Sequence, residues 1–253
     1  MYLNFEWSKT DKMINEELEN VSKHILNTLN MNSIRKYVKK FKLENLKILE
    51  SSGTNIVLVS DNTEFVIQIY NNRETFTKIY STVLDIITNP IICIKVTDAY
   101  NLYFDTTDYL VQPICFNVKR HSCFWEKIKP LNSFSLEKIK QVIRYNKYKI
   151  IWDIGKVLFA FHTNGYIHGD CTIDNIGIKN GNFVVFDFDG SSMSKNDEYI
   201  DYSKFFKSLY FHTDDIFFKD FYLEIEFNRG ITLMNKILEE MDIKELEEMR
   251  VEY

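Results

Sequence analysis

The segment formed by residues 166–190 constrains the fold more than any other part of this chain. It contains two apolar runs, residues 176–178 and 183–186, which are joined by Lys-Asn-Gly-Asn. An Asn-Gly pair between two apolar runs is the strongest short-range signal for a β-hairpin, because both residues accept the positive φ angles of a type I′ turn. The sequence therefore predicts a tight hairpin over residues 176–186.

Polar residues flank this hairpin on both sides. His168-Gly169-Asp170 precedes it, Asn175 stands directly before its first strand, and Asp187 directly follows its second strand. Because the two ends of a hairpin lie side by side, we expect it to bring two carboxylates and one amide together. Phosphoryl transfer from ATP uses this set of groups. One Asp accepts the proton of the attacking hydroxyl, while an Asn and a second Asp hold Mg²⁺.

The composition is that of a globular protein with a substantial core. Of the 253 residues, 45% are hydrophobic and 15% are aromatic, which suffices for one large domain or for two lobes that share a cleft. A formal net charge of -5 argues against a general nucleic-acid binder, whose surface would be strongly basic. The four cysteines form no C-x-x-C pair, so we expect reduced thiols rather than a disulfide framework or a zinc site.

The sequence also leads to an expectation about location. The N-terminus has no basic stretch followed by an apolar one, which a secretory signal would have. No apolar run approaches the roughly 18 residues that a membrane-spanning helix needs. We therefore expect a cytoplasmic protein without a membrane span.

The first half of the chain begins with a predicted helix over residues 11–30 and then becomes rich in strand patterns. Three β-rich runs separated by turn-forming residues predict an antiparallel meander, over residues 46–49, 56–59 and 65–70. A helix is predicted next, over residues 72–88. Further strands are predicted over residues 91–96 and 109–114.

The second half of the chain has mainly helical patterns around the hairpin. Helices are predicted from Ser135 onward and over residues 148–164, 199–212, 216–228 and 231–250. This change of pattern predicts three parts. They are an N-terminal helical extension (1–45), a β-rich nucleotide-binding lobe (46–116) and a helical catalytic lobe (117–253).

Two basic regions interrupt an otherwise acidic chain. The first is a cluster of Arg35, Lys36, Lys39, Lys40 and Lys42, which is typical of a solvated helix face, with a binding surface as the alternative. The second, residues 118–150, holds nine Lys or Arg against two acids. It is either a solvated pair of helices or a positive surface that attracts an anionic acceptor.

The sequence from His168 to Asn175 reads His-Gly-Asp-Cys-Thr-Ile-Asp-Asn and matches the pattern H-G-D-x-x-x-x-N. In this respect the chain resembles the protein-kinase-like superfamily. The resemblance is closest to its small-molecule branch of aminoglycoside and choline phosphotransferases and lipopolysaccharide-core sugar kinases. Gly169 favours this branch, because protein kinases usually have Arg at that place. The resemblance implies a bilobal α+β fold with a small antiparallel β-rich N-lobe, a helical C-lobe, and ATP and Mg²⁺ bound between them.

The resemblance also implies roles for the polar residues around the hairpin. Asp170 would be the base that deprotonates the acceptor hydroxyl. Asn175 and Asp187 would coordinate Mg²⁺, and Asp189 is an alternative metal ligand that could also reach a second ion. His168 would have a structural role. Asp201 would either brace the catalytic loop or act as a helix N-cap.

Two backbone segments would contact the nucleotide in such a fold. The turn formed by Ser52, Gly53 and Thr54 could bind phosphate through its N–H groups, although it also fits an ordinary hairpin turn. The segment 109–115 resembles the hinge that binds adenine through its backbone, with the carbonyl of Pro113 and the N–H of Cys115 available. The end of an apolar strand is the alternative for this segment.

The third predicted strand departs from the family pattern. Gln68 stands where family members carry a Lys that contacts the phosphates, so a positive charge is missing from that place. Glu74 is the candidate for the helix acid that would pair with such a Lys. Arg73 or Lys78 could supply the missing cation from the same helix.

These patterns lead to one main expectation and two alternatives. The main expectation is an ATP- and Mg-dependent phosphotransferase that acts on a hydroxyl of a small-molecule or sugar-like acceptor, which could be anionic. The first alternative, prompted by Gln68, is a catalytically impaired pseudokinase that works as a binding or regulatory module with a protein partner. A Ser/Thr protein kinase is the weaker alternative, because Gly169 replaces Arg and few residues separate the hairpin from Asp201. No nucleic-acid partner is expected.

Overall fold

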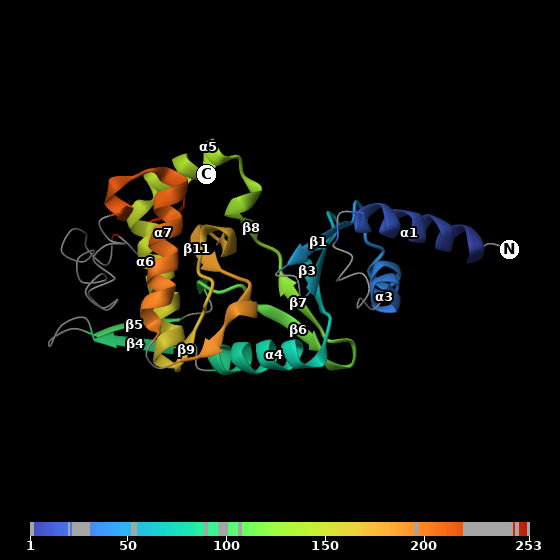
Figure 1. The fold of residues 1–253 in the computed structure, drawn as a ribbon, viewed down its shortest axis with the longest axis horizontal. Coiled ribbons are helices and arrows are strands. Elements are labelled where there is room, and N and C mark those ends of the chain that lie inside the picture. The colour runs from blue at the N-terminus through green and yellow to red at the C-terminus, as the bar shows by residue number, and fades with distance from the viewer. Residues whose placement is uncertain are drawn as a thin grey trace. The chain divides into compact units, whose positions relative to one another are not determined.

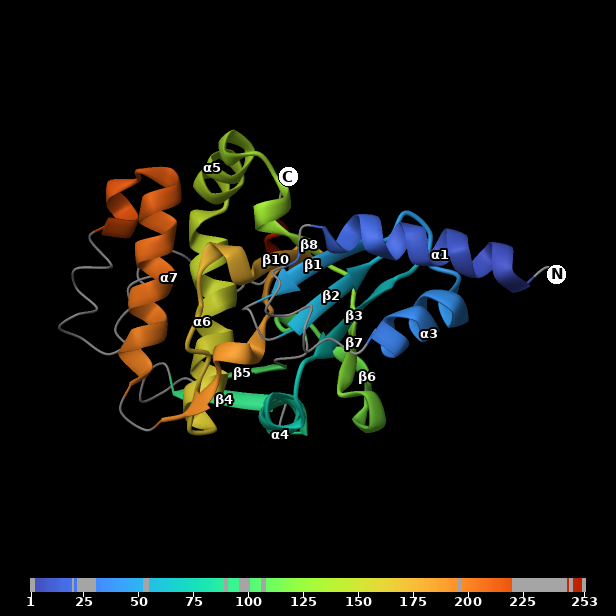
Figure 2. The ribbon, with the colours of Figure 1, turned by 45° about the vertical axis from the view of Figure 1, so that its right-hand side comes forward.

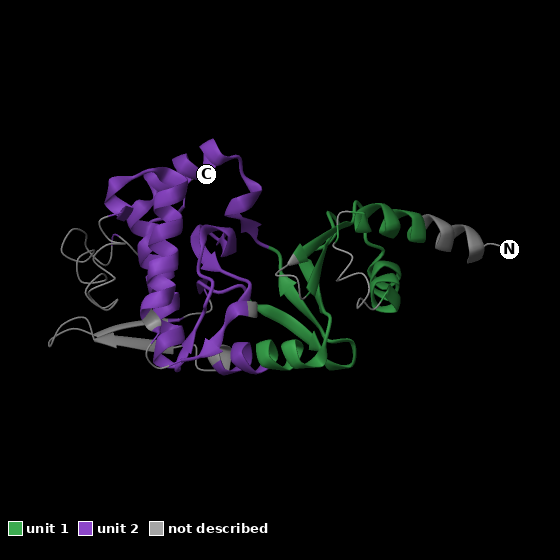
Figure 3. Cartoon of the chain, viewed as in Figure 1, with its two compact units in different colours: residues 1–80, 112–127 green, residues 81–111, 128–253 purple. Residues whose placement is uncertain are grey.

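The protein has a mixed α+β fold with a small antiparallel sheet and several helices (Figure 1). The computed structural model describes residues 3–19, 21, 31–51, 55–88, 91–95, 101–105, 108–194, 197–219, 245 and 248–251. The chain divides into two compact units (Figure 3). Unit 1 consists of residues 1–80 and 112–127, and unit 2 of residues 81–111 and 128–253.

Unit 1 contains a five-stranded antiparallel sheet with the strand order β1-β2-β3-β7-β6. Its strands are β1 (Lys47–Ser51), β2 (Asn55–Val59), β3 (Phe65–Tyr70), β6 (Pro113–Asn117) and β7 (Ser122–Glu126). The predicted meander of the first three strands is confirmed. Strand β6 begins later than the strand predicted over residues 109–114. Its first residue is a proline, which is tolerated because β6 is an edge strand that leaves one side of its backbone unpaired.

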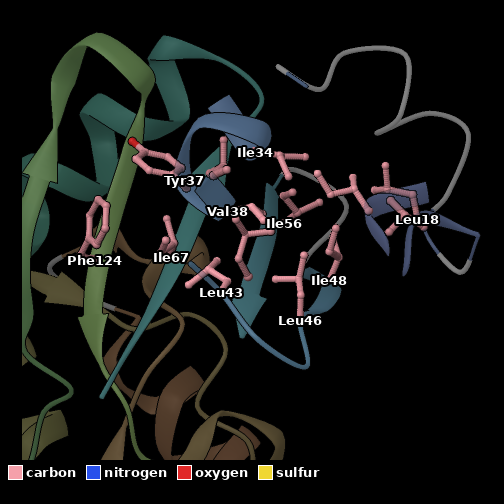
Figure 4. Close-up of a cluster of buried hydrophobic side chains, with 14 residues drawn as sticks. Leu18, Ile34, Tyr37, Val38, Leu43, Leu46, Ile48, Ile56, Ile67 and Phe124 are labelled. Carbon is pink, nitrogen blue, oxygen red and sulfur yellow. The ribbon is translucent and has the colours of Figure 1, made fainter. Parts of the chain in front are cut away.

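Two helices cover one face of this sheet, α1 (Leu3–Leu18) and α3 (Met31–Phe41) (Figure 2). The alternation of β3 directs Ile67 and Ile69 to this face, where they pack with Ile34 and Val38 of α3 in one buried cluster (Figure 4). The cluster also contains Ile14 of α1. Helices α1 and α3, which lie in the part expected as an N-terminal helical extension (1–45), therefore share one core with the sheet.

The other face of the sheet carries aromatic residues. Tyr70 of β3 packs against Phe76 of helix α4 (Arg73–Thr88), and Phe116 of β6 contacts both Phe76 and Trp125 of β7. Helix α4 belongs to unit 1 up to Tyr80 and to unit 2 from Ser81 onward. This face is thus covered over β3, β6 and β7, whereas Leu49 of β1 is 51% exposed.

Among its described residues, unit 2 is built mainly on three helices, one three-stranded sheet and two further pairs of short strands. The helices are α5 (Leu136–Tyr145), α6 (Lys147–Thr163) and α7 (Glu198–Thr213). Strand β10 (Ile176–Lys179) pairs with β11 (Asn182–Val185) on one side and with β8 (Lys129–Pro130) on the other. The remaining pairs are β9 (Tyr166–Ile167) with β12 (Ser192–Met193), and β4 (Ile91–Lys95) with β5 (Asn101–Asp105).

The predicted hairpin is confirmed in unit 2. Lys179 pairs with Asn182, and the two residues between them have positive φ angles, 52° at Asn180 and 80° at Gly181. Gly165 stands directly after the C-cap of α6, Asn164, and has a φ of 78°. The helices predicted over residues 216–228 and 231–250 lie largely outside the described residues, as does the second half of the helix predicted over 11–30.

A buried ion pair joins α6 to the hairpin. The Lys149 amine donates to Asp153 Oδ1 at 2.7 Å and to Asn182 Oδ1 at 3.0 Å, and both charged side chains are 0% exposed. The second oxygen of Asp153 accepts the N–H of Phe183 in β11 at 2.9 Å. Burial raises the pKa of Asp153 to about 6, although the nearby lysines act in the opposite direction. Within the described part of the chain, no helix has both the length and the apolar character needed to cross a membrane.

Candidate functional site

The loop formed by residues 168–170 is held by a buried carboxylate of α7. Asp201 is 0% exposed, and its two oxygens accept the backbone N–H groups of His168 at 2.8 Å and of Gly169 at 2.7 Å. His162 of α6 lies 3.0 Å from the same carboxylate. Burial disfavours the charge on Asp201, but the hydrogen bonds from His162 and from the His168 backbone outweigh burial and lower its pKa. Asp201 therefore braces the loop and is not the N-cap of α7, a position that Asp197 occupies.

Gly169 is required in this loop for two reasons. Its φ angle is 79°, a conformation that residues with a β-carbon rarely adopt. A β-carbon at this position would also lie 2.3 Å from the carbonyl oxygen of Gly190, which is backbone and cannot turn aside. The glycine is therefore explained by the close approach of two backbone segments.

His168 is a buried structural residue. Its Nδ1 accepts the N–H of Asp170 at 3.3 Å, and its Nε2 lies 3.2 Å from the carbonyl oxygen of Phe186. A carbonyl only accepts, so the ring must carry its proton on Nε2 and be neutral. Burial lowers the pKa of His168, which agrees with a neutral ring that packs between Phe161 and Phe188.

Asn175 fixes the side chain of Asp170. Its Nδ2 donates to the backbone oxygen of Asp170 at 2.8 Å and to Asp170 Oδ2 at 2.9 Å. Both partners are oxygen atoms of Asp170 that accept hydrogen bonds. The amide atom that faces them must therefore be the nitrogen, because the amide oxygen would be repelled. The Asp170 side chain remains 53% exposed, whereas Asn175 is buried. The loop thus presents a carboxylate to solvent in a fixed orientation.

Lys204 is a site residue that the sequence reasoning missed. Its amine lies 3.4 Å from Asp170 Oδ1 and also donates to the carbonyl oxygen of Gly169. Lys204 follows Asp201 by three residues on α7, so the two side chains lie on the same side of the helix. This spacing could have pointed to Lys204 in the sequence. If Asp201 contacts the loop, a residue one turn further along the same side of the helix also lies close to the loop.

Asp187 begins a 3₁₀ turn, Phe188–Gly190, at the end of the hairpin. Its backbone is in the left-handed region, with a φ of 61° and a ψ of 76°. The preceding residue, Phe186, donates its N–H to the carbonyl oxygen of Asn175 at 3.0 Å, which ties this end of the hairpin to the loop. The Oδ1 atom of Asp187 is buried and accepts no hydrogen bond, although the residue has other interactions. The side chain of Asp189 lies outside the described residues.

The polar groups of this loop fit a hard cation such as Mg²⁺. With Nδ2 of Asn175 bonded to Asp170, the amide can offer a cation only its oxygen. Mg²⁺ prefers oxygen ligands and commonly takes one or two from protein and the rest from phosphates and water. In the part of the chain that the structure describes, no three or more His, Cys, Asp or Glu residues gather as a metal cluster.

Comparison with known proteins adds no relative. No protein-family model matches this sequence, and no curated protein sequence matches it. The assignment of a function therefore depends on the residues and on their geometry.

In unit 1, Gln68 is part of a buried hydrogen-bond network. Its Nε2 donates to Asn55 Oδ1 at 2.9 Å, and its Oε1 accepts from Tyr70 Oη and from Trp125 Nε1, both at 2.8 Å. Gln68 itself is only 7% exposed. Both ends of the amide are thus bonded within the sheet, to three different side chains.

Of the other residues predicted to bind nucleotide in unit 1, three are not described and Glu74 is exposed on α4. Ser52, Gly53 and Thr54 fall outside the described residues. Glu74 is exposed in the first turn of α4, which also carries the exposed Arg73 and Lys78.

The segment predicted as a hinge, residues 109–115, contains a passage between the two units. Pro113 and Cys115 belong to β6, the edge strand of the unit 1 sheet, which was the alternative that the sequence left open. Val111 donates its N–H to the carbonyl oxygen of Val185 at 3.1 Å. The chain passes from unit 2 into unit 1 between Val111 and Gln112. The last passage from unit 1 into unit 2 comes after β7, between Lys127 and Ile128. The lobe boundary expected at residue 116 thus differs from the observed division.

Proposed function

We propose that the protein is an ATP- and Mg-dependent phosphotransferase with the bilobal fold of the protein-kinase-like superfamily, acting on a hydroxyl of a small-molecule or sugar-like acceptor. The observation that carries this proposal is the pair of hydrogen bonds from Asn175 Nδ2 to Asp170. They join the two residues that the sequence motif pairs, five positions apart, and leave a fixed, exposed carboxylate beside an amide oxygen. Phosphoryl transfer needs a proton acceptor and a metal ligand held together in this way.

Asp170 would accept the proton of the attacking hydroxyl. Since Oδ2 is occupied by Asn175, the acceptor would approach Oδ1. The Asp201 hydrogen bonds to His168 and Gly169 fix the backbone on which this carboxylate stands. Such preorganisation lowers the reaction barrier, because the catalytic group need not be oriented during the reaction.

Asn175 Oδ1 and the carboxylate of Asp187 would hold Mg²⁺, which when bound neutralises charge on the β- and γ-phosphates. The link between Phe186 and Asn175 keeps these two ligands on adjacent backbone segments.

Lys204 would supply positive charge at this site. Its amine lies beside Asp170 Oδ1, where the attacking oxygen would bind, and can stabilise negative charge that develops on the transferred group. In protein kinases a Lys of the third strand contacts the phosphates. The residue in that strand here is Gln68, whose polar atoms are bonded within the sheet.

A small acceptor is favoured over a protein substrate by the segment that follows the hairpin. Only residues 188–197 separate Asp187 from α7, and part of this segment forms β12, which pairs with β9. A long regulated activation segment, typical of many protein kinases, has no room there. The tight contact of Gly169 with Gly190 keeps the same segment against the loop.

A second candidate, a pseudokinase that binds nucleotide or a protein partner without catalysis, is favoured by the network around Gln68. A buried amide with three hydrogen bonds has a structural role and offers no charge to a phosphate. The two candidates differ in whether the Asp170 site turns over ATP.

Two measurements test the proposal and separate the candidates. Mg-ATP should increase the free energy of unfolding of the wild type by RT ln(1 + [L]/Kd), where [L] is the free ligand concentration and Kd its dissociation constant, and so raise the melting temperature. Asp187→Asn should abolish the metal-dependent part of this increase. The absence of a metal-dependent shift in the wild type would rule out the phosphotransferase. If binding is seen, ATP turnover is compared between the wild type and Asp170→Ala. Equal background rates in both would identify the pseudokinase.

A further inference from the structure

Helix α3 of unit 1 carries its positive charges on one side. Arg35, Lys36, Lys39 and Lys40 occupy positions i, i+1, i+4 and i+5, which project from the same side of a helix. The opposite side is formed by Ser33, Ile34, Tyr37 and Val38, all buried against the sheet. The helix contains no acidic residue.

This charge pattern differs from that of an ordinary solvated helix. Like charges four residues apart destabilise a helix, and α3 contains two such pairs, Arg35 with Lys39 and Lys36 with Lys40. The neighbouring helix α1 instead mixes both signs and forms an i,i+4 pair between Lys12 and Glu16 at 3.7 Å. A helix face can be solvated by charges of either sign, so solvation does not explain why all four charges on this face of α3 are positive. The whole chain, in contrast, has a net charge of -5.

The stripe lines a pocket of about 710 Å³. Asn32 and Asp11 complete the lining, which among the described residues carries four cations and one carboxylate, and Lys39 has a further interaction. That carboxylate is bonded to Arg35 Nε at 2.7 Å, which orients the guanidinium at the α1 side of the pocket. A concave surface with an excess of one charge concentrates ions of opposite charge.

We propose that this pocket, which we call the α3 anion pocket, binds a compact polyanion with two or three phosphate groups. The four cations span residues 35–40, or about 7.5 Å along a helix. Clustered phosphates of one small ligand match this length, and the pocket volume lies in the range of small-ligand sites. A nucleic acid would require a longer basic track, since such proteins commonly neutralise about 6–10 phosphates. This proposal does not depend on the proposed phosphotransferase activity, whose residues in unit 2 are different.

The test uses calorimetric titration of the full-length protein with sodium tripolyphosphate, in EDTA and about 0.15 M salt. The wild type should bind one ligand saturably. The double variant Lys36→Glu/Lys40→Glu should bind roughly a hundredfold more weakly, because charge-assisted hydrogen bonds contribute tenfold or more each. The neutral variant Lys36→Gln/Lys40→Gln should lose only roughly tenfold, because its amides still donate neutral hydrogen bonds to the phosphates.

A matched control has the same change in net charge at residues that do not line the pocket. Lys47 on β1 and Lys119 after β6 are exposed residues of unit 1 that do not line it. Lys47→Glu/Lys119→Glu should alter affinity by less than about twofold, because separated surface charges are screened at this ionic strength. Equal losses in both double variants, or no saturable binding by the wild type, would overturn the proposal. Tighter binding of a 12-base-pair DNA duplex than of tripolyphosphate would overturn it as well.

Discussion

The contact between Gly169 and Gly190 leads to a quantitative prediction for Gly169→Ala. A residue with a β-carbon at a φ of 79° costs about 1–2 kcal/mol. The new β-carbon would also lie 2.3 Å from the Gly190 oxygen, so the loop must move. That movement should break at least one hydrogen bond to Asp201, and hydrogen bonds to charged groups contribute about 1.5–3 kcal/mol. We expect a total destabilisation of about 3–5 kcal/mol.

Gly165 provides the matched control. Its φ angle is 78°, almost the same as that of Gly169, but an added β-carbon there would meet nothing within 4 Å. Gly165→Ala should therefore lose only the conformational part, about 1–2 kcal/mol. The difference between the two variants isolates the backbone contact from the effect of the φ angle.

Urea unfolding with linear extrapolation measures both losses, and ATP turnover of the folded variants is measured beside it. Gly169→Ala should also reduce turnover, because Asp170 is the next residue and would move with the loop. If both glycine variants lose the same free energy, the close approach of Gly190 does not constrain the loop. Our explanation of this glycine would then be wrong.

Three further predictions concern buried and charged groups. Asp153→Asn should destabilise the protein by about 3–5 kcal/mol in urea unfolding, since it leaves Lys149 buried without its counter-charge, and a smaller loss would show that the pair is solvated. Because the folded-state pKa of His168 is lowered below the unfolded value of about 6.5, its contribution to stability is complete above that pH and is lost as the pH falls. Stability should therefore decrease between about pH 7.5 and 5.5 by more in the wild type than in His168→Gln, and identical pH profiles would contradict the buried neutral ring. Lys204→Met should lower kcat for ATP turnover by roughly 10–100-fold with an unchanged melting temperature, and Lys204→Arg should restore most of it. Full activity of the Met variant would exclude Lys204 from the site.

The sequence predicted local structure well where a short-range signal was strong. The Asn180-Gly181 turn and its flanking strands were predictable because the turn chemistry and the alternation agree. Strand β7 was not predicted, because its five residues lie within the basic segment 118–150, which was interpreted by its charge and not by its strand pattern. The role of the α1 and α3 helices in the sheet's core also depends on contacts between distant parts of the chain.

The candidate site shows the same limit. Asp170, Asn175 and Asp187 could be chosen from a motif, because their spacing is local. Lys204 approaches Asp170 only because α7 packs against the loop, 34 residues away in sequence. Gln68 could be placed on a strand, but its partner Trp125 lies 57 residues further along the chain. The structural role of this amide could therefore not be seen in the sequence.

The bonds from Asp201 also bear on the timescale of motion at this loop. Binding loops usually open easily, and their amide protons exchange with solvent quickly. Here the amide protons of His168 and Gly169 are held by a buried carboxylate that belongs to a helix. These two protons should therefore exchange as slowly as those in the middle of α7, in a single cooperative opening with that helix. A ligand arriving at Asp170 would then meet a surface that is already rigid, and its binding would involve little loss of loop entropy.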